Sequence, residues 1–196
     1  LLAACRPGPN GRGIADPHPL AFILLRNPVR ENAKETFAYF RDQGVTIKVI
    51  SGDNPVTVAA AAREAGIEGA DKYVDASTLT TEAEVAAACE TYNVFGRVKP
   101  NQKKQLIQAL QSKKHTVAMT GDGVNDAPAV KTADIGVAMG ITGTEVTKQS
   151  AKMILADDNF STIVATVREG RGIFDNIRKF LRYLLSSNVG EVFTVF

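Results

Sequence analysis

The chain has 196 residues, of which 44% are hydrophobic, and this is enough for one sizeable domain with an appendage. A formal net charge of +2 is too small to indicate nucleic-acid binding, and no basic cluster is interleaved with aromatic residues, so we expect no nucleic-acid partner. The two cysteines, Cys5 and Cys89, lie far apart without metal-ligand spacing, which favours free thiols. The sequence begins and stops inside apolar runs, so we expect a piece of a larger protein.

The first elements are a loop, a strand and a helix. Residues 6–19 are rich in proline and glycine, which predicts a loop or linker. The apolar run at 20–25 predicts a short strand. Asn27 and Pro28 form a helix-capping signature, so we expect a helix from there to about Gln43, with an apolar face that packs on a sheet.

A strand followed by a short polar turn comes next. Residues 46–50 (TIKVI) are typical of a strand in a sheet covered on both faces. The string SGDN at 51–54 follows directly, and Pro55 begins another helix. The Ser51 hydroxyl, the free backbone N–H groups and the helix dipole point at one spot, which predicts an anion site. An ordinary strand-to-helix connection with a capping asparagine explains the same string equally well.

The middle of the chain continues the alternation of strands and helices. Residues 68–93 predict a short strand and a helix, to which we assign no chemistry, and 94–98 predict another strand. Pro100 begins a helix through about Lys113, with Lys103 in its first turn. A lysine there is unfavourable for the helix dipole, so a nearby anion would explain it, although most helix lysines are only solvated.

Residues 119–128 (MTGDGVNDAP) are the most informative stretch. They follow an apolar run that predicts the end of a buried strand, and Asp126 is placed to cap the next helix. Asp122, Asn125 and Asp126 then lie on a loop at the carboxyl end of a strand, where open α/β sheets bind ligands. Their hard oxygens suit Mg²⁺ held next to a phosphate. For any single aspartate the alternative is a helix cap followed by a solvated acidic turn.

The remaining pattern completes an α/β domain and adds a long helix. Apolar strands are predicted at 135–139 and 152–155. The run Asp157-Asp158-Asn159 is expected to cap a helix that begins near Phe160 and runs to the end of the chain. Gly170 and Gly172 are expected to be flexible points within it. Strands that alternate with helices indicate a parallel sheet with helices on both faces.

The last residues combine basic and apolar character. Basic residues between 178 and 182 precede the apolar stretch 183–196, an order that indicates the cytoplasmic boundary of a membrane helix. These 14 residues are fewer than the roughly 20 needed to cross a bilayer, so we expect an incomplete membrane helix. Asn188 and Glu191 share one helix face, and an acidic residue at membrane depth indicates an ion path. The alternative is a soluble amphipathic helix that ends in a surface glutamate.

Together these motifs resemble the P-type cation-transporting ATPases, whose phosphorylation domain belongs to the haloacid-dehalogenase-like superfamily. TGDGVNDAP at 120–128 matches their Mg²⁺-binding hinge motif, and SGDN at 51–54 resembles their phosphoryl-contacting motif. GRVKPNQK at 96–103 is similar to their segment with a nucleotide-contacting arginine and a phosphate-neutralising lysine. NPVR at 27–30 resembles a hinge motif that has aspartate in place of Asn27. SSNVGE at 186–191 resembles the fifth transmembrane helix of the Ca²⁺-pumping branch.

The resemblance implies an ATP-driven cation pump of the Ca²⁺-transporting kind, with Mg²⁺ and ATP as cofactors. It implies a membrane location with this domain on the cytoplasmic side and a lipid contact through the last helix. Asp122 would be a Mg²⁺ ligand with Asp126 in support, Lys103 and Asp122 would be catalytic, and Asn188 and Glu191 would bind the transported cation. The residues implied to bind the phosphate or the nucleotide are Ser51, Gly52, Asp53, Arg97, Lys103 and Asn125.

The implied fold is a haloacid-dehalogenase-like Rossmannoid α/β domain followed by a helix that enters the membrane. Its expected parts are a linker or the end of the nucleotide domain (1–19), the phosphorylation domain (20–159), a stalk helix (160–182) and the start of a membrane helix (183–196). The family's phosphorylated aspartate lies in an Asp-Lys-Thr-Gly-Thr string that this chain lacks. We therefore expect the first, nucleophile-bearing strand to be missing and the chain alone to be inactive.

Two other interpretations compete with this one. A complete soluble phosphatase of the same superfamily would need a nucleophilic Asp-x-Asp after a first strand, and the only early aspartate, Asp16, has no predicted strand before it. A non-catalytic, truncated or decayed protein that binds Mg²⁺ or a partner stays open, since the phosphate motifs are present and the nucleophile is not.

Overall fold

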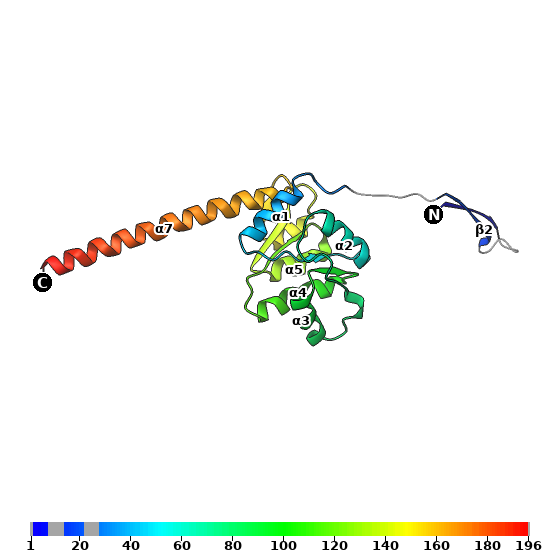
Figure 1. Cartoon of the computed structure of the whole chain (residues 1–196), viewed down its shortest axis with the longest axis horizontal. Coiled ribbons are helices and arrows are strands. Elements are labelled where there is room, and N and C mark those ends of the chain that lie inside the picture. Colours follow the sequence, from blue (N-terminus) through cyan, green and yellow to red (C-terminus); the bar gives the residue numbers. More distant parts are fainter. Residues whose placement is uncertain (1, 8–13, 22–27, 196) are drawn as a thin grey trace.

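The computed structural model describes residues 2–7, 14–21 and 28–195 (Figure 1). The first two segments, β1 (Leu2–Pro7) and β2 (Ile14–Ala21), pair as antiparallel strands. Part of the predicted 6–19 loop is therefore a strand. Local proline and glycine content does not reveal this, because the strand forms by pairing with another segment. Most of the strand predicted at 20–25 lies outside the described residues.

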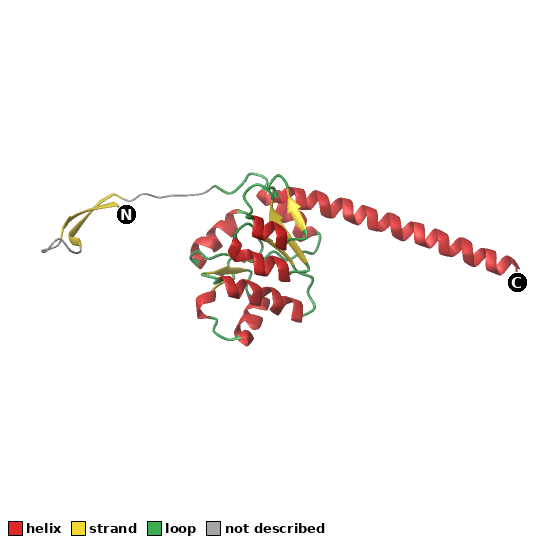
Figure 2. Ribbon diagram, turned by 180° about the vertical axis from the view of Figure 1, so that it is seen from behind, coloured by secondary structure: helices red, strands yellow, loops and turns green. Residues whose placement is uncertain are grey.

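Residues 28–159 form an α/β body in which helices pack around parallel strands (Figure 2). The first sheet has the order β3-β5-β4, with bounds β3 (Val49–Ile50), β5 (Val94–Gly96) and β4 (Tyr73–Asp75). The second has the order β6-β7-β8, with bounds β6 (Ala118–Gly121), β7 (Ile135–Met139) and β8 (Met153–Leu155). All four pairings within these sheets are parallel, which confirms the predicted fold class.

The strands do not form the single continuous sheet that the sequence predicted. Strands β3 and β6 are end strands of their sheets, and neither has a second neighbouring strand within the described residues. Parallel strands form a continuous sheet only where a neighbouring strand continues the ladder, and the described residues place no strand between β3 and β6.

The helices alternate with the strands, and two single 3₁₀ turns join them. The helices are α1 (Ala33–Asp42), α2 (Pro55–Glu64), α3 (Glu82–Thr91), α4 (Pro100–Ser112), α5 (Ala127–Thr132), α6 (Glu145–Ser150) and α7 (Phe160–Val195). The 3₁₀ turns are η1 (Ala76–Thr78) and η2 (Val124–Asp126). Helices α2 and α4 begin at the predicted prolines, because proline at the first helical position lacks only an N–H that has no partner there.

Helix α1 begins later than the Asn27–Pro28 signature predicted. It starts at Ala33, and Asn27 itself lies outside the described residues. Arg30 Nη1 donates a hydrogen bond to the Asp158 carbonyl oxygen at 2.9 Å, and Asn32 Nδ2 donates to Asn159 Oδ1 at 3.3 Å. These contacts hold the segment before α1 against the turn that precedes α7, so tertiary bonds override the local helix signal.

Helix α4 connects the two sheets through the core. Leu106 packs in a cluster with Phe95 of the first sheet, and Ile107 packs in a second cluster with Met119 of the second sheet. Ile50 of β3 is partly buried against both clusters. Helix α4, whose first turn carries Lys103, is therefore held in place by core contacts with both sheets.

Helix α7 projects away from the body as one continuous helix (Figure 1). It runs through Gly170 and Gly172 without a break, so the predicted flexible points are not interruptions of the helix. Its first residue, Phe160, contacts Phe37 of α1 with ring centroids 6.4 Å apart. None of its residues is buried. Within the described part of the chain, no helix combines the length and apolarity needed to cross a membrane.

Candidate phosphate and magnesium site

The loops at the carboxyl ends of β3 and β5 are joined by backbone hydrogen bonds. Ser51 N donates to the Phe95 carbonyl at 2.9 Å, and Val98 N donates to the Ser51 carbonyl at 3.0 Å. Arg97 N donates to the Asp53 carbonyl at 2.8 Å. The structure therefore brings together the predicted phosphate or nucleotide residues Ser51, Asp53 and Arg97.

The Ser51 turn is compact and internally bonded. The Ser51 hydroxyl accepts a hydrogen bond from Asp53 N at 3.1 Å, and Asn54 caps α2 by accepting from Val56 N at 3.0 Å. Gly52 and Asp53 are exposed. These bonds suit an ordinary capped connection, and the exposed tip of the turn leaves room for an anion, so both interpretations of the SGDN string stay open.

Arg97 is held in an unusual backbone conformation next to an acidic partner. Its φ of +52° lies in the left-handed region, which is uncommon for a residue with a side chain. Its guanidinium pairs with the Asp75 carboxylate at 2.8 Å. Hydrogen bonds from Ser77 lower the pKa of the Asp75 carboxyl below its usual range, and Arg97 lowers this pKa further. The sequence predicts no role for Asp75, and the available signal is its position at the end of a predicted strand.

Asp126 folds back beneath the loop that follows β6. Lys103 Nζ lies 2.5 Å from Asp126 Oδ1, and Gly123 N donates to Asp126 Oδ2 at 3.3 Å. The side chains of Lys103 and Asp126 are only 15% and 12% exposed. A Cβ at Gly121 would overlap Asp126 Cβ, so glycine is required for this close approach.

These contacts correct one prediction and explain another. Asp126 occupies the position before α5, but its side chain makes no capping hydrogen bond there, so the predicted cap is wrong. The ion pair with Lys103 and the Gly123 amide use both carboxylate oxygens instead. The anion that accounts for Lys103 in a first helical turn is therefore the Asp126 carboxylate within the chain itself.

The side chains of Asp122 and Asn125 have no partner within the described residues. Both residues are exposed, and within the described residues neither side chain forms a hydrogen bond or an ion pair. The Asp122 backbone carbonyl, by contrast, accepts a hydrogen bond from Thr144 N at 2.9 Å. The loop therefore fixes the backbone of Asp122 and leaves its carboxylate available to a ligand.

The donor set fits Mg²⁺ better than a metal that needs a complete protein cage. No group of three or more histidine, cysteine, aspartate or glutamate residues that could hold a metal occurs in the described part of the chain. Mg²⁺ is usually held by one or two carboxylates and completed by waters and substrate phosphates. Asp122 supplies a free carboxylate of this kind, and Asp126 supports the loop from below.

The loop after β7, residues 140–144, bonds the Asp122 loop through Thr144 and is itself held by Asp158. The Asp158 carboxylate accepts hydrogen bonds from Ile141 N at 2.9 Å, and from the backbone N and hydroxyl of Thr142 at 2.8 and 2.7 Å. The Ile141 bond, followed by those from Thr142, lowers the pKa of Asp158 from 3.8 to about 2. From the sequence, Asp158 is predicted only as part of a helix cap, because these partners lie 16 and 17 residues away.

The predicted residues do not all come together. Within the described residues, no hydrogen bond or ion pair links the Ser51–Arg97 group to the Lys103–Asp126 pair. Asn188 and Glu191 lie near the far end of α7, exposed and remote from both groups (Figure 1). They belong to a separate region of the molecule.

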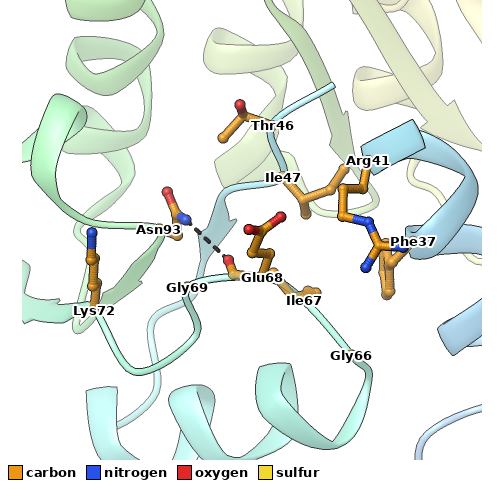
Figure 3. A pocket seen from close by; sticks show the side chains of 10 residues that line it. All are labelled: Phe37, Arg41, Thr46, Ile47, Gly66, Ile67, Glu68, Gly69, Lys72 and Asn93. Carbon is orange, nitrogen blue, oxygen red and sulfur yellow. Dashed lines mark hydrogen bonds between the residues drawn. The ribbon is translucent and has the colours of Figure 1, made fainter. Parts of the chain in front are cut away.

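A pocket of about 330 Å³ lies at the opposite end of the first sheet (Figure 3). Ile47, Lys72 and Asn93 line it, and each lies just before one of the strands β3, β4 and β5. Asn93 Nδ2 donates to the Glu68 carbonyl at 3.0 Å at its edge (Figure 3). Because the predicted phosphate residues lie at the carboxyl ends of the strands, this pocket is not part of their site.

Comparisons with known proteins agree with the fold and the motifs. A family model described as haloacid dehalogenase-like hydrolase matches residues 6–134. The catalytic domain of the CPx-ATPase CopB-B is structurally similar, with a TM-score of 0.55, 27% sequence identity, and coverage of 70% of this chain and 45% of that chain.

Curated relatives are similar over most of the chain. The endoplasmic reticulum-type calcium-transporting ATPase 4 of Arabidopsis thaliana is 45% identical over 184 residues, 90% of this chain and 17% of the relative. A calcium-transporting ATPase of Bacillus subtilis is 45% identical over 169 residues, 85% of this chain and 19% of the relative. The probable cation-transporting ATPase F of Mycobacterium tuberculosis is 48% identical over 175 residues, with 85% and 19% coverage.

The chain thus spans less than a fifth of the length of these relatives. The matched region includes the loop that presents Asp122 and the lysine that pairs beneath it. The chain therefore belongs to the haloacid dehalogenase-like hydrolases, and its relatives within them are P-type cation-transporting ATPases.

Proposed function

We propose that this chain is part of an ATP-driven cation pump of the Ca²⁺-transporting kind, to which it supplies loops that bind Mg²⁺ and phosphate. The observation that carries the proposal is the buried Lys103–Asp126 pair, which supports a loop whose Asp122 carboxylate has no partner within the described residues. The similarity to calcium-transporting ATPases supports the Ca²⁺ assignment.

Each residue has a role in this proposal that follows from its position. Asp122 binds Mg²⁺, which when present neutralises phosphate charge during phosphoryl transfer. Lys103 neutralises Asp126 and, being partly exposed, offsets negative charge on a phosphate at the loop. Asn125 and the Ser51 turn, including the Gly52 amide, donate hydrogen bonds to phosphoryl oxygens.

The nucleotide side lies next to the Ser51 turn. Asp53 and Arg97 lie together there, and the exposed Arg97 guanidinium is anchored by Asp75, which leaves its remaining N–H groups for the nucleotide. A fixed guanidinium loses less conformational freedom on binding than a free one, so the Asp75 contact favours ligand capture.

The transported cation would bind on α7. Asn188 and Glu191 provide oxygen ligands on one face of the helix, and oxygen ligands favour Ca²⁺ over softer metals. The apolar side chains that α7 exposes suit a bilayer, and the basic residues at 178–182 suit its cytoplasmic surface. We accordingly place the parent protein in a membrane with the α/β body on the cytoplasmic side.

The chain alone is proposed to be inactive, because it lacks the Asp-Lys-Thr-Gly-Thr string that receives phosphate in the family. Incubation with labelled ATP, Mg²⁺ and Ca²⁺ should give no acid-stable phosphoprotein. A longer reading frame with that string upstream should give a Ca²⁺-dependent phosphoprotein. Label on the 196-residue chain itself would contradict this part of the proposal.

The magnesium site has a direct test on this chain. Calorimetric titration of Asp122→Ala with Mg²⁺ should show an affinity at least about tenfold lower than that of the unchanged chain. The matched control is Asp71→Ala, because Asp71 is an exposed surface residue paired with Arg63. Equal affinities for the Asp122 variant and the unchanged chain would rule out Asp122 as the ligand.

A second candidate function is a non-catalytic protein that binds Mg²⁺ or a partner. This chain has the site geometry but not the nucleophile string. If the flanking reading frame also lacks that string, the binding function is favoured over the pump. Sequencing the DNA on both sides separates the two. A pump requires the string upstream and further apolar segments downstream, and a stop codon or unrelated sequence leaves binding alone.

A further inference from the structure

Thr147 is a completely buried polar residue that no part of the proposed function uses. It lies on α6 with 0% of its surface exposed. Its hydroxyl donates a hydrogen bond to the Gly123 carbonyl at 2.8 Å, and it lies 2.8 Å from the Thr144 hydroxyl. A buried hydroxyl therefore contacts the backbone of the residue immediately after Asp122.

The donors and acceptors in this cluster have only one consistent arrangement. A carbonyl oxygen can only accept, so the Thr147 proton must point at Gly123. The Thr144 hydroxyl then donates to Thr147 Oγ1, and Thr144 Oγ1 accepts from Thr147 N at 3.4 Å. The cluster is a directed chain that ends on the Asp122 loop.

The start of α6 thus holds two consecutive carbonyls of the loop. Thr144 N donates to the Asp122 carbonyl at 2.9 Å, and Thr147 donates to the Gly123 carbonyl. Gly123 also accepts from Asp126 N at 2.9 Å within its own turn. Without the Thr147 hydroxyl, only this internal bond would fix the Gly123 carbonyl, and the peptide plane could rotate.

This backbone support fixes the point from which the Asp122 side chain leaves the loop. The Asp122 carboxylate makes no hydrogen bond or ion pair within the part of the chain that the structure describes. No side-chain contact holds it, so the carboxylate rotates about its own single bonds, and the backbone of residues 122 and 123 sets the region that it can reach. A ligand group needs such backbone support to bind a metal well.

We propose that Thr147 is a positioning residue for the magnesium site, because its hydroxyl holds the Gly123 carbonyl and so keeps the backbone that carries Asp122 in place for the metal. The proposal rests on the proposed function of Asp122 as a Mg²⁺ ligand. Thr147 does not touch the metal and acts only through the loop.

Two substitutions separate the hydroxyl from the methyl group of Thr147. Thr147→Val keeps the volume and removes the hydroxyl, and calorimetric Mg²⁺ titration of the full chain should show an affinity lower by about tenfold. Thr147→Ser keeps the hydroxyl and loses a methyl group, so its Tm should fall while its Mg²⁺ affinity stays within about twofold. Ser150→Ala is the matched control, because Ser150 lies on the same helix and, among the described residues, its hydroxyl bonds the Val146 carbonyl of its own helix.

Several outcomes would overturn the proposal. A Val variant that binds Mg²⁺ as tightly as the unchanged chain would show that the hydroxyl does not position Asp122. A Ser variant that loses as much affinity as the Val variant would assign the effect to packing. If Thr147→Val does not fold, Thr147→Cys replaces it, because a thiol is a weak donor; affinity equal to that of the Ser variant would then overturn the proposal.

Asp122→Ala measured in the same series identifies which idea fails. If this variant loses affinity and Thr147→Val does not, only the positioning role is wrong. If neither variant changes the affinity, the assignment of Asp122 as the ligand is itself wrong.

Discussion

The α/β body and helix α7 stabilise their structure in different ways. The body buries large side chains completely, and Phe95 is only 1% exposed. Helix α7 buries none of its 36 residues and exposes large apolar side chains such as Phe174, which is 64% exposed. Burial drives folding in the body, whereas α7 depends in water on its own backbone hydrogen bonds and helix propensity. The body therefore removes its largest apolar side chains from water, whereas α7 leaves such side chains exposed.

The largest contrast should come from matched phenylalanine substitutions. Phe95→Ala should lower the free energy of unfolding by about 3–5 kcal/mol, because it removes a buried aromatic side chain from the core. Phe174→Ala should change it by less than about 0.5 kcal/mol. Urea denaturation followed by fluorescence and circular dichroism measures both, and similar losses for the two variants would contradict the comparison.

The buried ion pair should be the next most sensitive feature. Asp126→Ala leaves the Lys103 ammonium almost buried without its partner and should cost about 2–4 kcal/mol. The control is Glu145→Ala, which removes a 79% exposed carboxylate from its pair with Lys148 and should cost less than about 1 kcal/mol. Equal changes in urea midpoint would show that burial does not distinguish the two pairs.

Asp158 should give the body a dependence on acid pH. Its folded pKa of about 2 lies below the ordinary value of 3.8, so its stabilisation is complete above pH 4 and is lost as the pH falls from about 4 to about 2. Asp158→Asn removes the charge, so its Tm should lie below that of the unchanged chain at pH 6, and the gap should narrow towards pH 2.

Thermal melts at several pH values between 6 and 2 measure this gap. Asp42→Asn is a suitable control, because Asp42 is exposed on α1 and pairs only with its neighbour Arg41. A gap for the Asp158 variant that stays constant with pH would contradict a role for its carboxylate.

The smallest effect is expected for a glycine of α7, and a glycine of the body should respond with the opposite sign. A Cβ at Gly172 on α7 meets no atom within 4 Å, so Gly172→Ala should stabilise that helix by about 0.5–1 kcal/mol. Far-UV circular dichroism should show more helix with an unchanged melting temperature of the body. In the body, a Cβ at Gly96 would overlap Pro55, so Gly96→Ala should destabilise. Stabilisation by both substitutions would contradict the comparison.

Local signals in the sequence predicted much of the framework. The prolines that begin α2 and α4, and the glycine-rich loop after β6, act through backbone chemistry within a few residues, so they could be recognised in one dimension. The SGDN and TGDGVNDAP motifs lie between a strand and a helix as predicted, because strand and helix ends also have local signals. Lys103 stood out because its charge opposes the helix dipole, and the structure supplies the anion.

Other features depended on partners distant in the sequence. The late start of α1 follows from the contact between Arg30 and Asp158, which are 128 positions apart in the sequence. The carboxylate of Asp126 pairs with Lys103, which lies 23 positions away. The Arg97–Asp75 pair spans 22 positions. The short strand β3 and the division of the sheet depend on backbone pairing between segments far apart in the sequence, such as Val49 with Val94.

By itself, the sequence determined the α/β class, the order of the motifs and the loop that presents Asp122, because caps, glycine turns and apolar periodicity are local. Only the tertiary structure decided that Asp126 lies beneath its loop, that Arg97 leans on Asp75 and that Thr147 supports Gly123. Ion pairs and buried hydrogen bonds join groups that only the folded chain brings within 3 Å, where the loss of water makes their partners decisive.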